Sequence, residues 1–121
     1  MSSLPDFELP ITATLVAAGA IATRDFNIVH HDRDAAVRAG STDIFMNILT
    51  TTGLVQRYVS DHYGPSAQIK ACQLRLGAPA YPGDTLVFSG TASEEDGLTI
   101  VDVVGKVSLG DHVTAKVTVA L

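Results

Sequence analysis

The sequence predicts an α+β domain in which a curved antiparallel sheet wraps around one long central helix. Three observations favour it. One long segment in the first half has helix-capping residues at its start and Gly64-Pro65 at its end. From residue 68 on, apolar and polar residues alternate in short runs that proline and glycine separate, as in strands. A length of 121 residues suits a single domain, spanning 1–121, with one core.

The first half of the chain predicts a strand and a short helix before the central helix. Residues 11–24, "ITATLVAAGAIATR", are rich in β-branched and small residues without a helical stripe, which predicts a long strand bent near Gly19. Residues 32–40 suit a short helix that Asp32 caps and Gly40 closes.

The central helix is predicted over residues 43–62, with a cap among residues 41–43. Its middle, "TTTG", holds poor helix formers, so the helix needs a sheet wrapped around it. The residues expected to share one face are Ile44, Ile48, Thr52, Val55 and Val59.

Four strands are expected in the second half. The first, residues 68–76, is expected to bulge near Cys72, and Asp96-Gly97 reads as a hairpin turn. The last two strands are expected to meet across Gly110-Asp111. One helix wrapped by such a sheet is the hot-dog arrangement, whose other sheet face commonly packs on a second copy or a homologue.

Composition narrows the class of protein. Hydrophobic residues form 46% of the chain and aromatic residues 6%, so the core must be aliphatic and one face is expected to bind another subunit. The net charge of −5 argues against nucleic acid. Cys72 is the single cysteine, expected to be a small buried residue, and a reducing cytoplasm fits. Neither a signal peptide nor an apolar stretch of about 20 residues that could span a membrane is evident.

Asp25 and His30 are the candidate catalytic residues. They lie five residues apart, and both side chains converge if residues 26–29 leave the sheet. A carboxylate and an imidazole could then hold one water and remove its proton. The alternative is that Asp25 forms a turn and His30 is a satisfied core residue. His31 is less well placed, because neighbouring side chains diverge.

Other polar residues give weaker signals. A metal site made of His30, His31 and Asp32 is disfavoured, because consecutive residues seldom share one tetrahedral site. His62 and His112 are expected on the surface. At the start of the central helix, the N–H groups around Met46, Asn47 and Ile48 lack helical acceptors and could stabilise an enolate oxygen. Every helix has such an end, so this matters only if Asp25 and His30 face it.

Three motifs resemble those of MaoC-like (R)-specific enoyl-CoA hydratases. "DFNIVHHD" at 25–32 resembles the D-x-N-P-x-H-x-D signature, and "IFMNILT" at 44–50 the I-x-H-G-x-x-T helix start. "PAYPGDTL" at 79–86 resembles the P-x-x-P-G-D-T-L loop. The chain departs from the family at Ile28, where the family has proline, and at Met46-Asn47, where it has His-Gly.

The resemblance implies that Asp25 and His30 form the catalytic pair and that no cofactor or metal is needed. It also implies that the Asn47 backbone N–H serves the oxyanion hole, while the Asn47 side chain enters the pocket. Asn27 and Met46 are expected beside it as substrate-binding residues.

"ATRDF", "DIFMNILT" and "LGDHVTA" are similar to one branch of the family, the small subunits of steroid side-chain enoyl-CoA hydratases in steroid-degrading bacteria. This implies a second, non-identical MaoC-like chain in an α2β2 assembly. In that branch the larger chain often carries a DUF35 domain that docks an aldolase.

The sequence therefore predicts a cytoplasmic hydro-lyase acting on a steroid side-chain enoyl-CoA, as the catalytic subunit of a heteromer. The alternatives are a general (R)-specific hydratase of linear acyl-CoA, a hot-dog thioesterase that directs the same water at the thioester carbonyl, and a scaffold whose partner carries the chemistry. The paired Asp25 and His30 speak against the scaffold.

Overall fold

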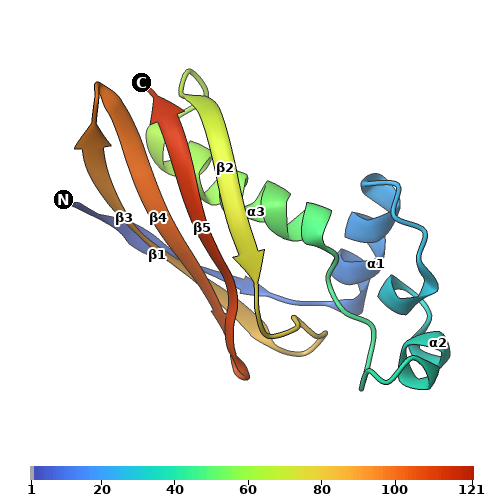
Figure 1. Cartoon of the computed structure of the whole chain (residues 1–121). Coiled ribbons are helices and arrows are strands. Elements are labelled where there is room, and N and C mark those ends of the chain that lie inside the picture. Colours follow the sequence, from blue (N-terminus) through green and yellow to red (C-terminus); the bar gives the residue numbers. More distant parts are fainter. Residues whose placement is uncertain (1) are drawn as a thin grey trace.

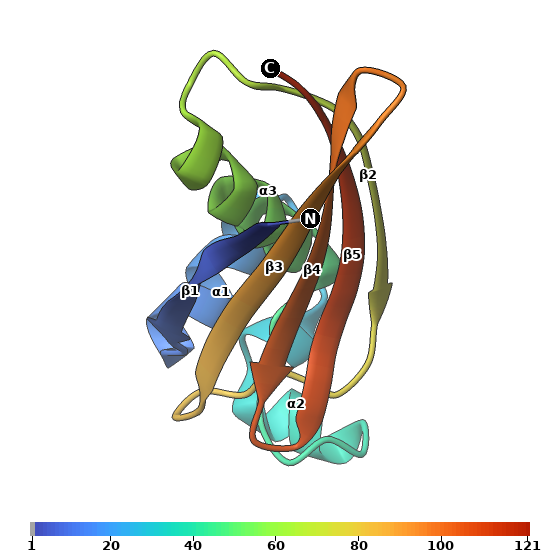
Figure 2. The ribbon, with the colours of Figure 1, turned by 90° about the vertical axis from the view of Figure 1, so that its left-hand side faces the viewer.

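The computed structural model describes residues 2–121, which form one curved sheet with helices on one side. The long helix α3 (Ile48–Tyr63) lies along a face of the sheet, and α1 (Ala13–Ala22) and α2 (Arg33–Arg38) gather beyond one end of it (Figure 1). The quarter-turned view shows α3 on one side of the curved sheet (Figure 2). Among residues 2–121, no helix is long and apolar enough to cross a membrane.

The sheet has five strands in the order β1-β3-β4-β5-β2, and all neighbours are antiparallel. Their bounds are β1 Ser2–Pro10, β2 Gln68–Leu76, β3 Thr85–Glu95, β4 Leu98–Val107 and β5 Gly110–Ala120. The predicted α+β hot-dog fold is confirmed.

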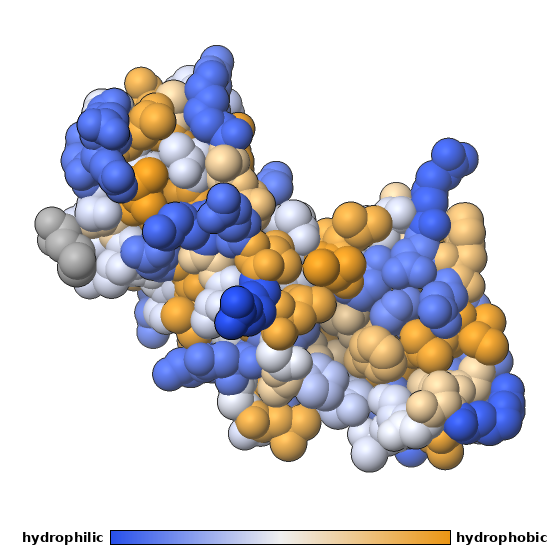
Figure 3. Space-filling view, viewed as in Figure 1, coloured by the Kyte–Doolittle hydropathy of each residue, from blue (hydrophilic) through white to orange (hydrophobic). Residues whose placement is uncertain are grey.

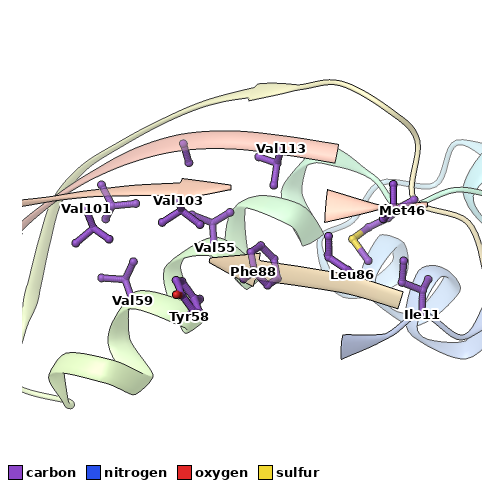
Figure 4. Packing of buried hydrophobic residues seen from close by; sticks show 14 of the residues in the cluster. Ile11, Met46, Val55, Tyr58, Val59, Leu86, Phe88, Val101, Val103 and Val113 are labelled. Atoms are coloured by element: carbon purple, nitrogen blue, oxygen red, sulfur yellow. The ribbon is translucent and has the colours of Figure 1, made fainter. Parts of the chain in front are cut away.

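The core lies between α3 and the concave face of the sheet. Val101 and Val103 of β4 face Val55 and Val59 of α3, and Phe88 of β3 lies beside them (Figure 4). All five are essentially inaccessible to solvent. Each such side chain stabilises the fold by about 1.5–3 kcal/mol relative to exposure. The core is mainly aliphatic, as the composition predicts.

The strand predicted over residues 11–24 is wrong, because α1 occupies most of it. The Thr12 hydroxyl accepts the Leu15 N–H at 3.0 Å and caps the helix. Alanine, the best helix former, supplies half of its residues, and only Val16 and Ala20, four apart, are buried. The β-branched residues therefore misled a prediction based on composition.

The first strand lies earlier, at β1, which the sequence did not reveal. β1 pairs with β3, and the register shifts between Leu4 and Phe7. Pro5 lies in this shift and has no N–H to donate. The shift breaks the alternation of buried and exposed residues that would otherwise mark a strand.

The central helix begins at Ile48 instead of residue 43. The Asp43 carboxylate accepts the N–H of its neighbour Ile44 at 2.7 Å, so it does not cap a helix. Further on, the Met46 N–H donates to the Ala80 carbonyl at 3.1 Å. These contacts hold residues 43–46 in a loop before the helix.

The N-cap of α3 is Asn47, and the helix ends at Gly64 with φ of 93°, as predicted. Its buried face differs in part from the predicted one, because Ile48 is half-exposed. The buried residues of α3 are Thr51, Val55, Tyr58 and Val59.

Of the predicted cap, turns and bulge, some are confirmed and others are displaced. Asp32 caps α2 through the Ala35 N–H, and Asp96-Gly97 forms the β3–β4 turn with positive φ at both residues, as predicted. The last turn is displaced, since Gly110 already belongs to β5 and the turn lies at residues 108–109. The β2 bulge lies between Ile69 and Ala71, just before Cys72, which is only half-buried.

His112 was expected on the surface but is buried, with 2% of its area exposed. Its Nδ1 lies 2.7 Å from the Ala78 carbonyl oxygen, which can only accept, so Nδ1 carries the hydrogen. Its Nε2 therefore accepts from the Thr51 hydroxyl at 2.8 Å. The neutral imidazole thus joins β5 to α3 inside the core.

This burial predicts a loss of stability at acid pH. Burial lowers the pKa of His112 below its ordinary 6.5, although the bond to Ala78 opposes the change. Below pH 6.5 the unfolded chain binds a proton at this histidine more readily than the folded chain does. The free energy of unfolding therefore decreases as the pH is lowered. His112→Gln removes this titration. The stability advantage of the wild type over His112→Gln should shrink below about pH 6.5, by up to about 1.4 kcal/mol per pH unit. Melting curves between about pH 5 and 8 measure it, and an advantage independent of pH would contradict the assignment.

Candidate active site

Asp25 leaves the C-terminal turn of α1 in a fixed direction. Arg24 adopts a left-handed conformation with φ of 60°, and its N–H donates to Ile21 at 3.0 Å. The Asp25 N–H donates to the Ala20 carbonyl at 2.9 Å. These bonds form a Schellman motif, with arginine where glycine is usual. Asp25 is thereby tied to the helix by its own backbone.

The Asp25 carboxylate is held through both oxygens. Its Oδ1 accepts the Asn27 N–H at 3.2 Å, and its Oδ2 accepts a hydrogen from the Asn47 amide at 3.2 Å. The same Oδ2 lies 3.4 Å from Nε2 of His30. The pKa of Asp25 is lowered, most strongly by the hydrogen bond from the Asn27 N–H, and further by the Asn47 amide and by His30. Burial acts in the opposite direction. Asp25 is therefore ionised at neutral pH.

His30 is the last residue of the short 3-10 helix η1 (Ile28–His30) and is buried. Its Nδ1 lies 2.7 Å from the Phe45 carbonyl oxygen. Because a carbonyl only accepts, Nδ1 carries the hydrogen, and Nε2 of the neutral ring presents a lone pair toward Asp25. The Phe45 ring meets the imidazole edge-on, with centroids 4.8 Å apart. The loop before α3 thus sets both the tautomer and the orientation.

The structure brings Asp25 and His30 together outside the sheet, as the sequence predicts. At 3.4 Å, Oδ2 and Nε2 are two acceptors close enough to receive the two hydrogens of one water. A water held in this way has its oxygen lone pair free for attack. The pair can therefore act as a general base with an orienting carboxylate.

His31 does not take part in this pair. It is exposed, and its Nε2 lies 3.4 Å from the Phe26 carbonyl oxygen. His62 is also exposed, as expected. Within residues 2–121, the His, Cys, Asp and Glu side chains form no group of three or more that could hold a metal.

Asn27 serves the loop itself. Its N–H holds Asp25, and its side-chain oxygen accepts the Val29 N–H at 3.3 Å to cap η1. The rest of Asn27 is exposed. Its contact with substrate stays a prediction.

The start of α3 supplies a different set of N–H groups from the predicted one. The N–H of Met46 is bound to Ala80 and its side chain lies in the core, so neither is free within this chain, and the contact of Met46 with substrate stays a prediction. Since α3 begins at Ile48, the N–H groups at its positive end are those of Asn47, Ile48 and Leu49.

Apolar side chains surround this region. In the space-filling view, apolar atoms gather over the start of α3 and beside α1, below a hollow between the sheet end and the helical end of the molecule (Figure 3). Five large apolar residues on α1, on the segment between α1 and α2 and on the start of α3 are about half-exposed or more, namely Ile21, Phe26, Ile28, Ile48 and Leu49. Single exposed residues are ordinary, but such a group indicates a binding surface.

Two functional contacts escaped sequence reasoning. The Asn47 side chain was expected to enter the pocket, whereas it binds both Asp25 and Thr23. The signal available was that asparagine is among the best N-cap residues. The Phe45 carbonyl that orients His30 gave no signal, because a backbone acceptor has no side-chain signature.

Comparisons with known proteins show the family of this chain. The model of the MaoC like domain family matches residues 3–117. The 3-oxo-4,17-pregnadiene-20-carboxyl-CoA hydratase beta subunit of Mycobacterium tuberculosis is 57% identical over 119 residues, which are 98% of this chain and 92% of the relative.

Solved structures extend the likeness to the fold. A chain of the ChsH1-ChsH2 complex from Mycobacterium tuberculosis superposes with a TM-score of 0.97 at 56% identity, covering 99% of this chain and 95% of that one. The (R)-hydratase from A. caviae involved in PHA biosynthesis gives a TM-score of 0.88 at 19% identity, covering 99% and 94%. The second likeness concerns the fold alone.

Proposed function

Because this chain belongs to the MaoC-like domain family, we propose that it is the catalytic subunit of a hydro-lyase for steroid side-chain enoyl-CoA thioesters. The enzyme adds water across the α,β double bond. The observation that carries this function is the 3.4 Å approach of Asp25 Oδ2 to His30 Nε2. The 57% identity with a steroid-carboxyl-CoA hydratase subunit supports the substrate class.

In the proposed reaction, a water donates one hydrogen to His30 Nε2 and the other to Asp25 Oδ2. Its oxygen bonds to Cβ while its proton passes to Nε2, and the electron pair of the double bond moves through Cα to the thioester oxygen. The resulting enolate collapses as the proton on Nε2 returns to Cα. The Phe45 carbonyl stabilises the transient imidazolium through Nδ1–H, and the Asp25 carboxylate stabilises it through its charge.

The enolate oxygen is the site of developing negative charge. The N–H groups of Asn47 and of the first turn of α3 are the proposed oxyanion donors, at the positive end of a 16-residue helix. We propose no cofactor and no metal, because the base, the orienting carboxylate and the oxyanion donors all come from the chain.

The chain works with a partner subunit. The beta-subunit relative and the ChsH1-ChsH2 complex both indicate a second, non-identical chain. We extend this to an α2β2 assembly with a MaoC-like partner that carries a DUF35 domain and docks an aldolase, on the strength of the motif resemblance alone. The cytoplasm is the proposed location, which suits a chain with one cysteine.

The test is an assay of the chain with its partner on a steroid side-chain enoyl-CoA. The absorbance of the conjugated enoyl thioester should fall while CoA stays attached to the product. A thiol reagent in the same cuvette detects the competing reaction, because a thioesterase would release free CoA. Loss of CoA without hydration would overturn the hydro-lyase.

A further inference from the structure

The Asn47 amide uses every hydrogen bond that it can make. It is buried, and its Nδ2 donates to the Thr23 hydroxyl oxygen at 2.9 Å and to Asp25 Oδ2 at 3.2 Å. Its Oδ1 accepts the N–H of Thr50 at 3.2 Å and also the Thr50 hydroxyl. A primary amide has two donor hydrogens and two acceptor lone pairs. The side chain therefore has nothing left for a substrate, although sequence reasoning expected it in the pocket.

The orientation of this amide is determined by its neighbours. The Thr50 N–H can only donate, so the amide oxygen must face α3. On the other side, the Thr23 hydroxyl donates its own hydrogen to the Gly19 carbonyl at 2.8 Å and presents a lone pair to Nδ2. If the amide were flipped, its NH2 group would face the Thr50 N–H, and two donors would meet. The NH2 group is thus fixed toward Asp25.

A close crossing of α1 and α3 makes these contacts possible. A Cβ on Gly19 of α1 would overlap the Thr50 side chain of α3, so only glycine allows this approach. The approach brings the end of α1, with Thr23 and Asp25, within reach of the N-cap of α3. Asn47 is the residue that joins the two helix ends.

We propose that the Asn47 side chain is a positioning residue that aims Asp25 Oδ2 at His30 and at the water that the two groups would share. The Asn27 N–H holds Oδ1 and Asn47 holds Oδ2, so the carboxylate cannot rotate without losing both bonds. This role differs from that of the Asn47 backbone N–H, and it rests on the proposed hydration reaction.

Two substitutions separate positioning from helix capping. Serine and aspartate cap helices about as well as asparagine, so Asn47→Ser and Asn47→Asp keep the bond to Thr50. Both remove the hydrogens that reach Thr23 and Asp25. Asn47→Ser should lower kcat by about 10-fold or more, and Asn47→Asp by on the order of 10²-fold, because it adds a repelling carboxylate beside Asp25.

The pH profile supplies a readout that helix capping alone would not move. The Asn47 amide helps to lower the pKa of Asp25. Its loss therefore raises that pKa, and the part of the acid limb of the kcat profile that reports protonation of Asp25 should move to higher pH in Asn47→Ser and further in Asn47→Asp. Assays use the chain with its partner subunit and the steroid side-chain enoyl-CoA.

Thr12→Ala is the matched control. Thr12 caps α1 through the Leu15 N–H, is exposed, and lies outside the site. Its loss costs about 1 kcal/mol, as for a typical cap. Melting temperature should fall in Thr12→Ala without a change in the acid limb. If the two Asn47 variants show only this loss of stability, with the wild-type pH profile, the positioning role is wrong.

A direct titration of Asp25 distinguishes failure of this inference from failure of the proposed function. With ¹³C-labelled aspartate, the Asp25 carboxyl signal can be followed by NMR in the complex without any turnover. A raised pKa of Asp25 in both variants supports the contact even if the wild type hydrates nothing. An unchanged pKa of Asp25 overturns the inference whatever the reaction is.

Discussion

Asp25→Asn and His30→Ala should each lower turnover by about 10²-fold or more, the usual scale for positioned acid–base groups. Asp25→Asn removes the negative charge beside His30 and sets an amide against the Asn47 donor. His30→Ala removes the Nε2 lone pair that accepts the proton from water. Steady-state kcat on the steroid side-chain enoyl-CoA, with the partner subunit present, measures both losses.

His31→Ala is the control for this pair. His31 is exposed, and its ring lies at a long 3.4 Å from the Phe26 carbonyl oxygen, so its loss should change kcat by less than about 3-fold. His30→Ala also leaves the Phe45 carbonyl without its donor, so a melting curve must show that the variant is folded at the assay temperature. Equal losses at His30 and His31 would indicate a structural role for the segment instead of general base catalysis.

The candidate pair was predictable from sequence because its geometry is local. Asp25 and His30 are five residues apart, and the turn between them is closed by short-range bonds from Asn27. The central helix and the four C-terminal strands were predictable for a similar reason, since turn residues and alternation mark them. The segment before α3 was not, because the Met46 N–H pairs with Ala80, far along the chain.

Residues with long-range partners were the ones that sequence reasoning misplaced. His112 reads as a polar residue near a strand end, yet Thr51 and Ala78 supply its two hydrogen bonds from other elements. α1 was read as a strand because its β-branched residues outweighed its alanines in the prediction, and the packing of Gly19 on Thr50 leaves no local signal. Hydrogen bonds that close over tens of residues leave no periodicity in the sequence.

We expect the chain without its partner to be poorly soluble or inactive toward the steroid thioester, and its partner to raise hydration by on the order of 10²-fold or more. The reason lies in the apolar residues around the site. Phe26 is 63% exposed, and Ile28, Ile48 and Leu49 are about half-exposed. A polycyclic acyl group and a partner surface together would cover them. Expression with and without a non-identical MaoC-like chain, followed by assay, measures the effect.

Substrate size should follow the same logic. We expect a fused-ring substrate to need more volume than two identical hot-dog chains supply, so a partner that keeps the fold but lacks its own Asp/His pair would provide room. Crotonyl-CoA should then be a poor substrate, because its short chain cannot use remote binding energy to orient the double bond against Asp25 and His30. The measurement is kcat/KM for crotonyl-CoA and for the steroid thioester on the same complex. A stable homodimer that hydrates crotonyl-CoA rapidly and ignores the steroid thioester would contradict the steroid assignment. In that case the apolar residues around the site would be cover for a linear acyl chain, and the chain would be a general enoyl-CoA hydratase.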